Sequence, residues 1–192
     1  MAAMNWLEKR FINSRGWDWL MRRSAAKALR CINDRPKNIL EVGCGKGTTT
    51  LALAQAFPHA AVTAIDVDAE QIELAKRREE PELRQVEFRT GSATATSLSH
   101  VSHDAVVSFN TLHHVGDWRQ ALKEWNRVLL PGGILLLVDV SQLFTQTVHR
   151  LMLTKELVHF SRKDIERELV KNGLSIECAK GRVMITLLAR KP

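Results

Sequence analysis

The sequence predicts an α/β protein with a Rossmann-like three-layer architecture, in which helices cover both faces of a mostly parallel, seven-stranded sheet. Short apolar runs alternate with segments of helical periodicity, a pattern typical of parallel strands joined by helices. The run Ile39–Val42 leads directly into Gly43, Gly45 and Gly47, and a helical segment follows at once. Only residues 179–182 separate the last two apolar runs, which is too short for a parallel crossover. We therefore expect an antiparallel C-terminal strand.

The length and composition favour one domain over residues 1–192. Hydrophobic residues make up 45% of the chain and charged residues 26%, which are ordinary values for a globular protein. No run of about 18 apolar residues is present and the first residues soon become charged, so we expect a cytoplasmic protein without a transmembrane helix or secretory signal. Cys31, Cys44 and Cys178 lack metal-binding spacing, which indicates reduced cysteines and no metal site.

The net charge of +7 and the pI near 9.7 favour acidic partners, such as nucleic acid, an anionic membrane surface or an anionic substrate. The positive charges are scattered, however, and the densest clusters are Arg22-Arg23 and Lys76–Arg78. Glu79 and Glu80 follow the second cluster directly, as at a solvated helix end. A basic surface without such a partner is therefore the simpler interpretation. No feature of the sequence predicts an oligomeric state.

Residues 5–33 have helical periodicity, and we expect Gly16 to separate a short first helix from a longer second one. The apolar positions of the longer helix recur at three- and four-residue steps: Trp17, Leu20, Met21, Ala25, Ala28, Leu29 and Ile32. Three of the five tryptophans lie among basic residues in this N-terminal part. Three interpretations stay open for residues 1–35: a helix packed on the edge of the domain, a lid over the substrate, and a helix at a membrane surface.

The remaining elements follow in order along the chain. We expect further strands at 61–65, 86–89, 104–109, 134–140, 174–178 and 183–189, and helices at 48–57, 69–78, 118–130 and 161–171. Asp68 and Asp117 are candidate N-caps, and residues 161–164 suit a capping box. The turn 131–133, Pro-Gly-Gly, should end one helix before the fifth strand. The amphipathic region 141–160 interrupts the alternation and is expected to lie near the substrate.

The turn at Gly43 is the candidate ligand site, because glycine permits left-handed backbone and a close approach of the ligand. Its spacing, Gly43-x-Gly45-x-Gly47, departs from the dinucleotide fingerprint G-x-G-x-x-G. Glu41 would repel a pyrophosphate and attract a cationic ligand. Asp66, at the end of the second strand, can accept hydrogen bonds from two ribose hydroxyls. The two acids together favour S-adenosylmethionine, which carries an amino group, a sulfonium and an adenosine.

Four segments, in this order, resemble the motifs of class I S-adenosylmethionine-dependent methyltransferases of the broad small-molecule type. They are Glu41–Gly47, Asp66, Asp104–Val115 and Leu129–Gly133. The resemblance covers about residues 36–190. It implies a seven-stranded sheet with an antiparallel last strand, and S-adenosyl-L-methionine as the cofactor. The family's motif of Asn or Asp followed by Pro-Pro and an aromatic residue is missing, which counts against methylation of adenine N6 or glutamine.

The resemblance implies that the cofactor contacts residues at the ends of the first four strands. The expected cofactor-binding residues are Glu41, Gly43, Cys44, Gly45, Gly47, Asp66, Val67, Ser92, Ala93 and Asn110. We interpret Cys44 as a small residue that fits the turn, not as a nucleophile. Ser92 stands where the family usually has an acid for the adenine amino group. We expect adenine contacts from Ser92 and neighbouring backbone, with weaker affinity; the alternative is that Ser92 is only a loop residue.

His113 and His114 follow the fourth strand, at the carboxyl edge of the sheet. Either one is a candidate general base, because histidine titrates near neutral pH. The same pair is common in the family across unlike substrates, so a role in the pocket wall or in packing is the stronger interpretation. The other histidines show no ligand spacing and are interpreted as surface or packing residues: His59, His100, His103, His149 and His159.

The leading hypothesis for function is methyl transfer from S-adenosylmethionine to a small or lipid-like acceptor that binds between residues 1–35 and 141–160. Methyl transfer needs mainly positioning and dry surroundings, so few side chains need be catalytic. One alternative keeps the cofactor but has RNA or protein as the substrate. Another is a non-catalytic module that binds the cofactor or a partner chain, and a nicotinamide oxidoreductase is a distant fourth hypothesis.

Overall fold

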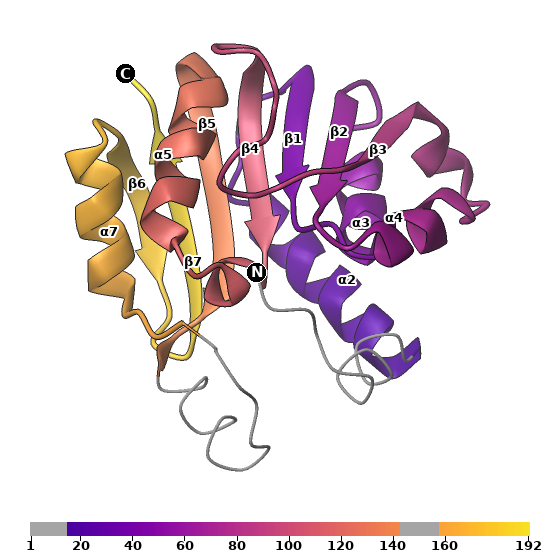
Figure 1. The fold of residues 1–192 in the computed structure, drawn as a ribbon, viewed down its shortest axis with the longest axis horizontal. Helices are drawn as coiled ribbons and strands as arrows, with labels where there is room; N and C mark the ends of the chain where they lie inside the picture. The colour runs from indigo at the N-terminus through magenta and orange to yellow at the C-terminus, as the bar shows by residue number, and fades with distance from the viewer. Residues whose placement is uncertain (1–14, 143–157) are drawn as a thin grey trace.

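A seven-stranded sheet lies at the centre of the computed structural model, which describes residues 15–142 and 158–192 (Figure 1). The strands are β1 Asn38–Val42, β2 Ala61–Asp66, β3 Val86–Thr90, β4 His103–Phe109, β5 Leu129–Val140, β6 Ser175–Lys180 and β7 Met184–Arg190. Their spatial order is β3-β2-β1-β4-β5-β7-β6. The first five strands pair in parallel, and β7 runs antiparallel to both β5 and β6. The predicted fold class is confirmed.

Helices cover both faces of this sheet. Successive side chains of a strand point to opposite faces, so apolar side chains on both faces need a covering layer. The α-helices are α2 Arg15–Leu29, α3 Thr48–Ala56, α4 Ala69–Lys76, α5 Trp118–Val128 and α7 Arg162–Lys171, and the 3-10 helices are η1 Pro81–Gln85 and η2 Leu112–His114. In β1, Leu40 and Val42 pack in the core that includes residues of α5 and α7. Ile39 points the other way and packs in the core that includes residues of α2 and α3.

Local signals in the sequence set most of the helix starts. The Asp68 carboxylate accepts a hydrogen bond from the Glu70 N–H at 3.0 Å and caps α4. Asp117 does the same for α5 through the Gln120 N–H, also at 3.0 Å. The predicted capping box at the start of α7 is present between Ser161 and Asp164. These caps satisfy N–H groups that the first helical turn leaves unpaired.

Two predicted boundaries are wrong. The 118–130 helix ends at Val128, and β5 begins at Leu129, so the Pro-Gly-Gly turn lies within the strand rather than before it. The reason is long-range pairing. Leu129 pairs with His103 of β4. The Gly132 N–H donates to the Lys191 carbonyl and the Lys191 N–H donates to the Gly133 carbonyl, both at 2.9 Å. The second error concerns Gly16, which lies in the first turn of α2 instead of between two helices.

Helix α2 packs on the sheet mainly through the second half of its sequence. Met21, Ala25, Ala28 and Leu29 are buried, in agreement with the predicted apolar stripe. Leu20, which was predicted to share this stripe, is 46% exposed. The short helix expected before Gly16 and the central part of the 141–160 region lie outside the described residues.

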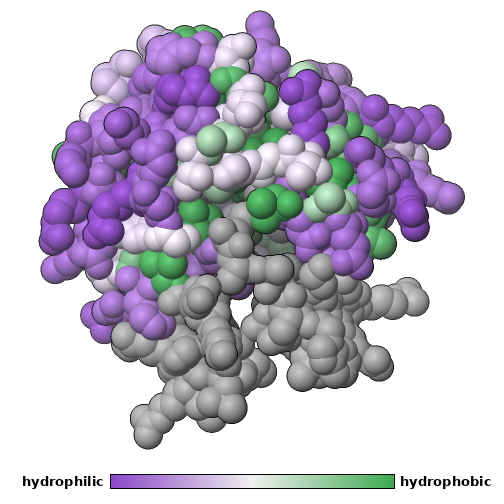
Figure 2. Space-filling view, viewed as in Figure 1, coloured by the Kyte–Doolittle hydropathy of each residue, from purple (hydrophilic) through white to green (hydrophobic). Residues whose placement is uncertain are grey.

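The described part of the chain contains five α-helices and all three cysteines. None of its helices combines the length and the apolar character that crossing a bilayer requires. Its three cysteines are free, and it contains no cluster of side chains suited to a metal ion. Figure 2 shows that hydrophilic residues cover most of the face that carries α5 and α7, while hydrophobic residues reach the surface near the middle of that face.

Candidate functional site

The glycine turn after β1 adopts the left-handed backbone that its sequence predicts. Gly43, Gly45 and Gly47 have φ angles of 79°, 52° and 81°. The N–H groups of Gly43 and Cys44 both donate to the Ile65 carbonyl, at 2.8 and 3.1 Å. The turn is therefore fastened to the end of β2, which brings the two predicted acidic positions to the same edge of the sheet.

Gly43 is required by the close approach of the segment that follows β4. A Cβ atom at this position would lie 2.0 Å from Oγ1 of Thr111. The Thr111 hydroxyl donates to the Gly43 carbonyl at 3.3 Å and to the Phe109 carbonyl at 3.1 Å. The turn after β1 and the turn after β4 are thus in direct contact at the carboxyl edge.

Glu41 is fully buried at the start of the glycine turn. Its Oε1 accepts a hydrogen bond of 2.6 Å from the Thr49 hydroxyl, whereas its Oε2 is buried without a hydrogen-bond partner. Burial raises the pKa of Glu41 to about 7, with a smaller contribution from the charge of Asp66. A buried carboxylate oxygen without a partner is costly. It is the feature of the turn that best suits a cationic ligand.

The raised pKa of Glu41 makes the stability of the ligand-free protein depend on pH. Between pH 4.5 and about 7 the folded state keeps a proton that the unfolded state has released, so the free energy of unfolding falls as pH rises. The expected fall due to this residue is about 3 kcal/mol at most. Urea unfolding at pH 5 and pH 8 measures it. The Glu41→Gln variant should lose this part of the fall, whereas Glu168→Gln on α7 should keep it; equal pH dependence in wild type and Glu41→Gln would contradict the assignment.

Asp66 lies at the end of β2, where the sequence predicted a ribose-binding acid. Its Oδ2 accepts a hydrogen bond from the Gly45 N–H and its Oδ1 accepts one from the Asp68 N–H, both at 2.9 Å. Burial raises the pKa of Asp66, and the two backbone N–H groups partly oppose this rise. The neighbouring Val67 is 45% exposed. The carboxylate therefore joins the glycine turn to the strand end at which the ribose was expected.

Cys44 is 4% exposed inside the turn. Burial, followed by the charges of Glu41 and Asp66, raises the pKa of its thiol well above the usual value. A thiol that stays protonated is a poor nucleophile. This agrees with the interpretation of Cys44 as a small residue that fits the turn.

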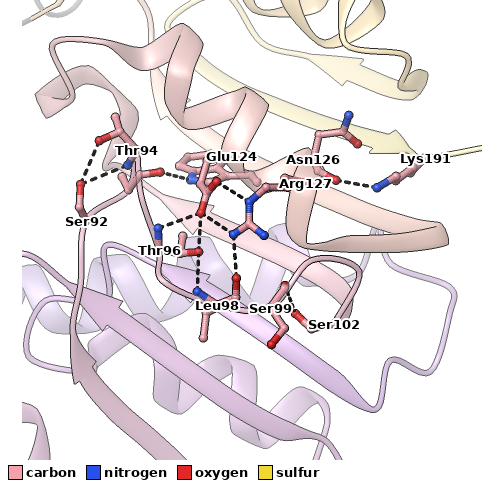
Figure 3. Close-up of polar contacts among 12 residues, drawn as sticks. Ser92, Thr94, Thr96, Leu98, Ser99, Ser102, Glu124, Asn126, Arg127 and Lys191 are labelled. Carbon is pink, nitrogen blue, oxygen red and sulfur yellow. Dashed lines mark hydrogen bonds and ion pairs between the residues drawn. The ribbon is translucent and has the colours of Figure 1, made fainter.

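The loop after β3 holds Ser92 in a polar network (Figure 3), and the Ala93 carbonyl accepts a hydrogen bond of 2.9 Å from the Trp125 indole N–H. The Ser92 hydroxyl lies 3.0 Å from the Thr94 hydroxyl and accepts a hydrogen bond from the Thr94 N–H. Further along, Glu124 of α5 accepts hydrogen bonds from the N–H and the hydroxyl of Thr96, at 2.9 and 2.7 Å. Arg127 donates to both carboxylate oxygens of Glu124. The sequence predicted the loop but not this buried anchor.

Asn110 lies directly after β4, with a φ angle of 51° that is unusual for a residue other than glycine. Its Nδ2 donates to Sδ of Met21 at 3.1 Å, while its Oδ1 is buried without a partner. Strained backbone of this kind often occurs at functional sites. Asn110 is thus a second residue at this edge with an unpaired buried oxygen.

Helix α2 is attached to the glycine turn by polar contacts near the start of the helix. The Asp18 carboxylate lies 3.0 Å from Nζ of Lys46 and accepts a hydrogen bond of 2.9 Å from the Thr48 hydroxyl. Trp19 and Leu20, the next residues of α2, are 63% and 46% exposed. The helix therefore both contacts the glycine turn, through Asp18, and carries exposed apolar side chains.

His113 and His114 occupy η2, and the surroundings of their side chains differ. Nδ1 of His113 lies 2.6 Å from Oδ1 of Asp139, a fully buried residue near the end of β5. Burial lowers the pKa of His114 to about 4, and the nearby His113 contributes to this shift. Sequence reasoning missed Asp139, although an acid inside the apolar run 134–140 is a signal in itself.

A second residue missed from the sequence is Gln71 of α4. Its side chain is 1% exposed, and its Nε2 is buried without a hydrogen-bond partner. A Cβ atom at Gly45 would lie 3.9 Å from the Gln71 Oε1, so this amide borders the glycine turn. The sequence signal for Gln71 is its position. It directly precedes Ile72, which was predicted to face inward, so helical periodicity places Gln71 near the buried face of α4.

The site and the sheet order define a class of protein. The family described as "Methyltransferase domain" matches residues 40–137, from β1 into β5. This is half of the chain, and the chain belongs to that family. Together with the fold, the match places it among the class I S-adenosylmethionine-dependent methyltransferases.

Curated relatives of the chain agree with this class. A demethylmenaquinone methyltransferase of Staphylococcus aureus is 36% identical over 104 residues, which are 54% of this chain and 43% of that protein. An uncharacterized methyltransferase of Mycobacterium tuberculosis is 35% identical over 109 residues, 52% of this chain and 49% of that protein. The chain thus matches at most about half the length of these curated relatives.

Two solved structures show the same fold at low sequence identity. A chain of the complex between the Haloferax volcanii Trm112 methyltransferase activator and a methyltransferase has a TM-score of 0.84 at 14% identity, covering 96% of this chain and 95% of that chain. A SAM-dependent methyltransferase of Methanosarcina mazei has a TM-score of 0.70 at 24% identity, covering 85% and 96%. At these identities the likeness concerns the fold.

Proposed function

We propose that this protein transfers a methyl group from S-adenosylmethionine to a small, lipid-like acceptor. The observation that carries the proposal is the buried Glu41 carboxylate, whose Oε2 has no partner beside a glycine turn. A ligand with a positively charged amino group and sulfonium would supply the missing interaction. Dinucleotides carry a pyrophosphate instead, which this acid would repel.

The residues at the carboxyl edge fit the parts of that cofactor. Glu41 and the unpaired Oδ1 of Asn110 are acceptors for its amino group, and Asp66 is the acceptor for its ribose hydroxyls. Val67, which is exposed, and the loop at Ser92 are proposed to border its adenine. When bound, the cofactor supplies a methyl group already activated by the sulfonium. The protein's own part is to position the acceptor and exclude water.

Two observations support an apolar acceptor. Trp19 and Leu20 are exposed on α2, the helix whose Asp18 and Met21 contact the glycine turn and Asn110. A relative that matches this chain over about half its length is named for demethylmenaquinone as its substrate. We propose that the acceptor binds beside α2, between the segments 1–35 and 141–160, and that the protein works in the cytoplasm.

The experiment that tests this function uses S-adenosylmethionine with a labelled methyl group and a fractionated cell extract. We expect label in the lipid or small-molecule fraction with wild-type protein and a strong decrease with Asp66→Ala. If the label appears in RNA or protein instead, the proposed acceptor class is wrong, while the proposed methyl transfer still holds. Cofactor binding without any labelled product would favour a non-catalytic module.

The second candidate is an RNA methyltransferase, which the net charge of +7 favours. Its distinguishing property is binding that weakens steeply with salt, because neutralised phosphates release counterions. Gel-shift titrations with a mixed RNA pool at 50 and 200 mM salt measure this property directly.

A further inference from the structure

The outer side of α2 combines two exposed apolar residues with a row of basic ones. Trp19 and Leu20 are 63% and 46% exposed. Arg23, Lys27 and Arg30, which follows the last residue of α2, are also exposed. A period of about 3.6 residues per turn places them on the same side as Trp19. The Arg23 guanidinium lies 5.5 Å from the centroid of the Trp19 ring, within reach of a cation–π interaction. We call these five residues the basic face of α2.

The packing of α2 on the sheet holds this face outward. Met21, Ala25 and Ala28, on the opposite side of the helix, are buried. Arg22 lies at the border between the two sides, where it donates to Oε1 of Gln55 at 3.5 Å. Figure 1 shows α2 against the sheet, with its first turns extending past the ends of β1 and β4. Because the helix already packs through its other side, the basic face stays available to a partner.

Nearby acids do not neutralise the positive charge of this face. Asp18, the only acid of α2, pairs with Lys46 of the glycine turn at 3.0 Å. Asp34, the next acid along the chain, pairs with Arg190 at 2.9 Å. Within residues 15–142 and 158–192, none of the three cations of the basic face lies at ion-pair distance from a carboxylate. The face therefore carries unpaired positive charge.

Helix α7 provides the comparison, because it is also rich in basic residues. Its Arg162, Arg167 and Lys171 each pair with an acid of the same helix, at 2.9, 3.6 and 3.6 Å. Such pairs are typical of a solvated helix surface. The unpaired charge on α2 is therefore a local property of that helix and does not simply follow from the net charge of +7.

The composition of the basic face fits an anionic phospholipid bilayer. Tryptophan and leucine side chains on a helix enter the boundary between head groups and acyl chains, while arginine and lysine beside them attract anionic head groups. RNA would also be attracted by the charge, but single strands are usually held in a basic groove with aromatic platforms for successive bases. Here the charge lies on the outside of one helix, with Leu20 beside Trp19. The observations therefore favour a membrane over RNA.

We propose that the basic face of α2 docks this protein on the surface of an anionic phospholipid bilayer. Its two apolar side chains enter the head-group boundary, and its three cations contact the lipid phosphates. Asp18, directly before Trp19, holds Lys46 in the glycine turn, so the docked protein has its candidate site near the membrane surface. The docking goes beyond the proposed methyl transfer and does not require the cofactor. It provides a route by which a lipid-like acceptor reaches the site.

The test is co-sedimentation of the full chain, without cofactor, with vesicles of phosphatidylcholine alone and of phosphatidylcholine mixed with phosphatidylglycerol. We expect binding to the mixed vesicles only, and its loss at about 1 M salt, where the screening length falls to about 3 Å. The double variant Arg23→Gln, Lys27→Gln should bind the mixed vesicles about 30-fold more weakly, since each cation near an anionic surface contributes a factor of about five. Trp19→Ala should weaken the binding about tenfold, because it removes apolar surface from the boundary.

The matched control is the double variant Lys123→Gln, Lys163→Gln, which changes two exposed lysines of α5 and α7. It removes the same charge and should bind the mixed vesicles as wild type does. An equal loss in the two double variants would reduce the attraction to net charge and overturn the proposal.

Two further outcomes would also overturn the docking surface. One is a wild-type protein that binds neither kind of vesicle. The other is binding to a mixed RNA pool, without binding to vesicles, that is lost in the Arg23→Gln, Lys27→Gln variant; the face would then belong to RNA. The proposed methyl transfer is judged separately. Vesicle binding by a protein that incorporates no labelled methyl group would remove that function and keep the docking surface, whereas methyl transfer without vesicle binding would do the reverse.

Discussion

The Asp66→Ala variant is expected to bind S-adenosylmethionine about 100-fold more weakly than wild type, a loss of about 3 kcal/mol for two hydrogen bonds to a charged group. The carboxylate lies at the end of β2 and is the acceptor proposed for both ribose hydroxyls. It also holds the Gly45 N–H at 2.9 Å, so its removal loosens the glycine turn. Isothermal titration calorimetry measures the change.

A matched control for this variant lies at the opposite edge of the sheet. Asp104, near the start of β4, also accepts hydrogen bonds from two backbone N–H groups, those of Lys37 and Asn38, at 2.9 Å each. Asp104→Ala should therefore lose comparable backbone contacts and keep its cofactor affinity. Equal affinities for wild type and Asp66→Ala would remove the ribose assignment.

Two substitutions in the glycine turn should differ in how far they lower stability, and the milder one should abolish cofactor binding. Gly43→Ala should lower the free energy of unfolding by about 3 kcal/mol or more, since it adds overpacking to a strained left-handed backbone. Its Cβ would lie 2.0 Å from Thr111, with a φ of 79°. At Gly45 the nearest atom to a Cβ is 3.9 Å away, and φ is 52°. Gly45→Val should cost about 2 kcal/mol of stability and still abolish cofactor binding by filling the turn.

Chemical denaturation measures the stability of the two variants, and calorimetry on the folded variants measures their binding of S-adenosylmethionine. The expected order of stability is wild type, then Gly45→Val, then Gly43→Ala. A Gly45→Val protein that is folded and binds S-adenosylmethionine normally would show that the ligand does not approach this part of the turn.

The alternation of apolar runs and helical segments was sufficient to predict the sheet, its two covered faces and its antiparallel last strand. The helix caps at Asp68 and Asp117 could also be predicted, since a cap depends on residues only two or three positions apart. The start of β5 could not, because it depends on the pairing of Leu129 with His103 and of Gly132 and Gly133 with Lys191. Contacts between residues so far apart in sequence leave no local pattern.

The candidate site likewise has residues that the sequence predicts and contacts that it does not. Glu41, Asp66 and the glycines lie directly at strand ends, where the family pattern marks them, and the structure places them at one edge. The contact between His113 and Asp139 joins residues 26 positions apart. Likewise, Asn110 adopts left-handed backbone after β4, and no glycine marks this position in the sequence. Ser92 lies in a polar loop as expected, while its role toward adenine stays a prediction.

The most direct test of the central claim is a calorimetric titration of S-adenosylmethionine and, separately, of NAD into wild-type protein and Glu41→Gln at pH 6 and pH 8. We expect wild type to bind S-adenosylmethionine and not NAD. Its affinity should increase toward pH 8, because Glu41, whose pKa is about 7, then carries the charge that the cationic ligand requires. Glu41→Gln should bind more weakly and lose most of that increase. Binding of NAD in preference to S-adenosylmethionine, or identical pH profiles for the two proteins, would contradict a site built around Glu41 for a cationic adenosyl ligand.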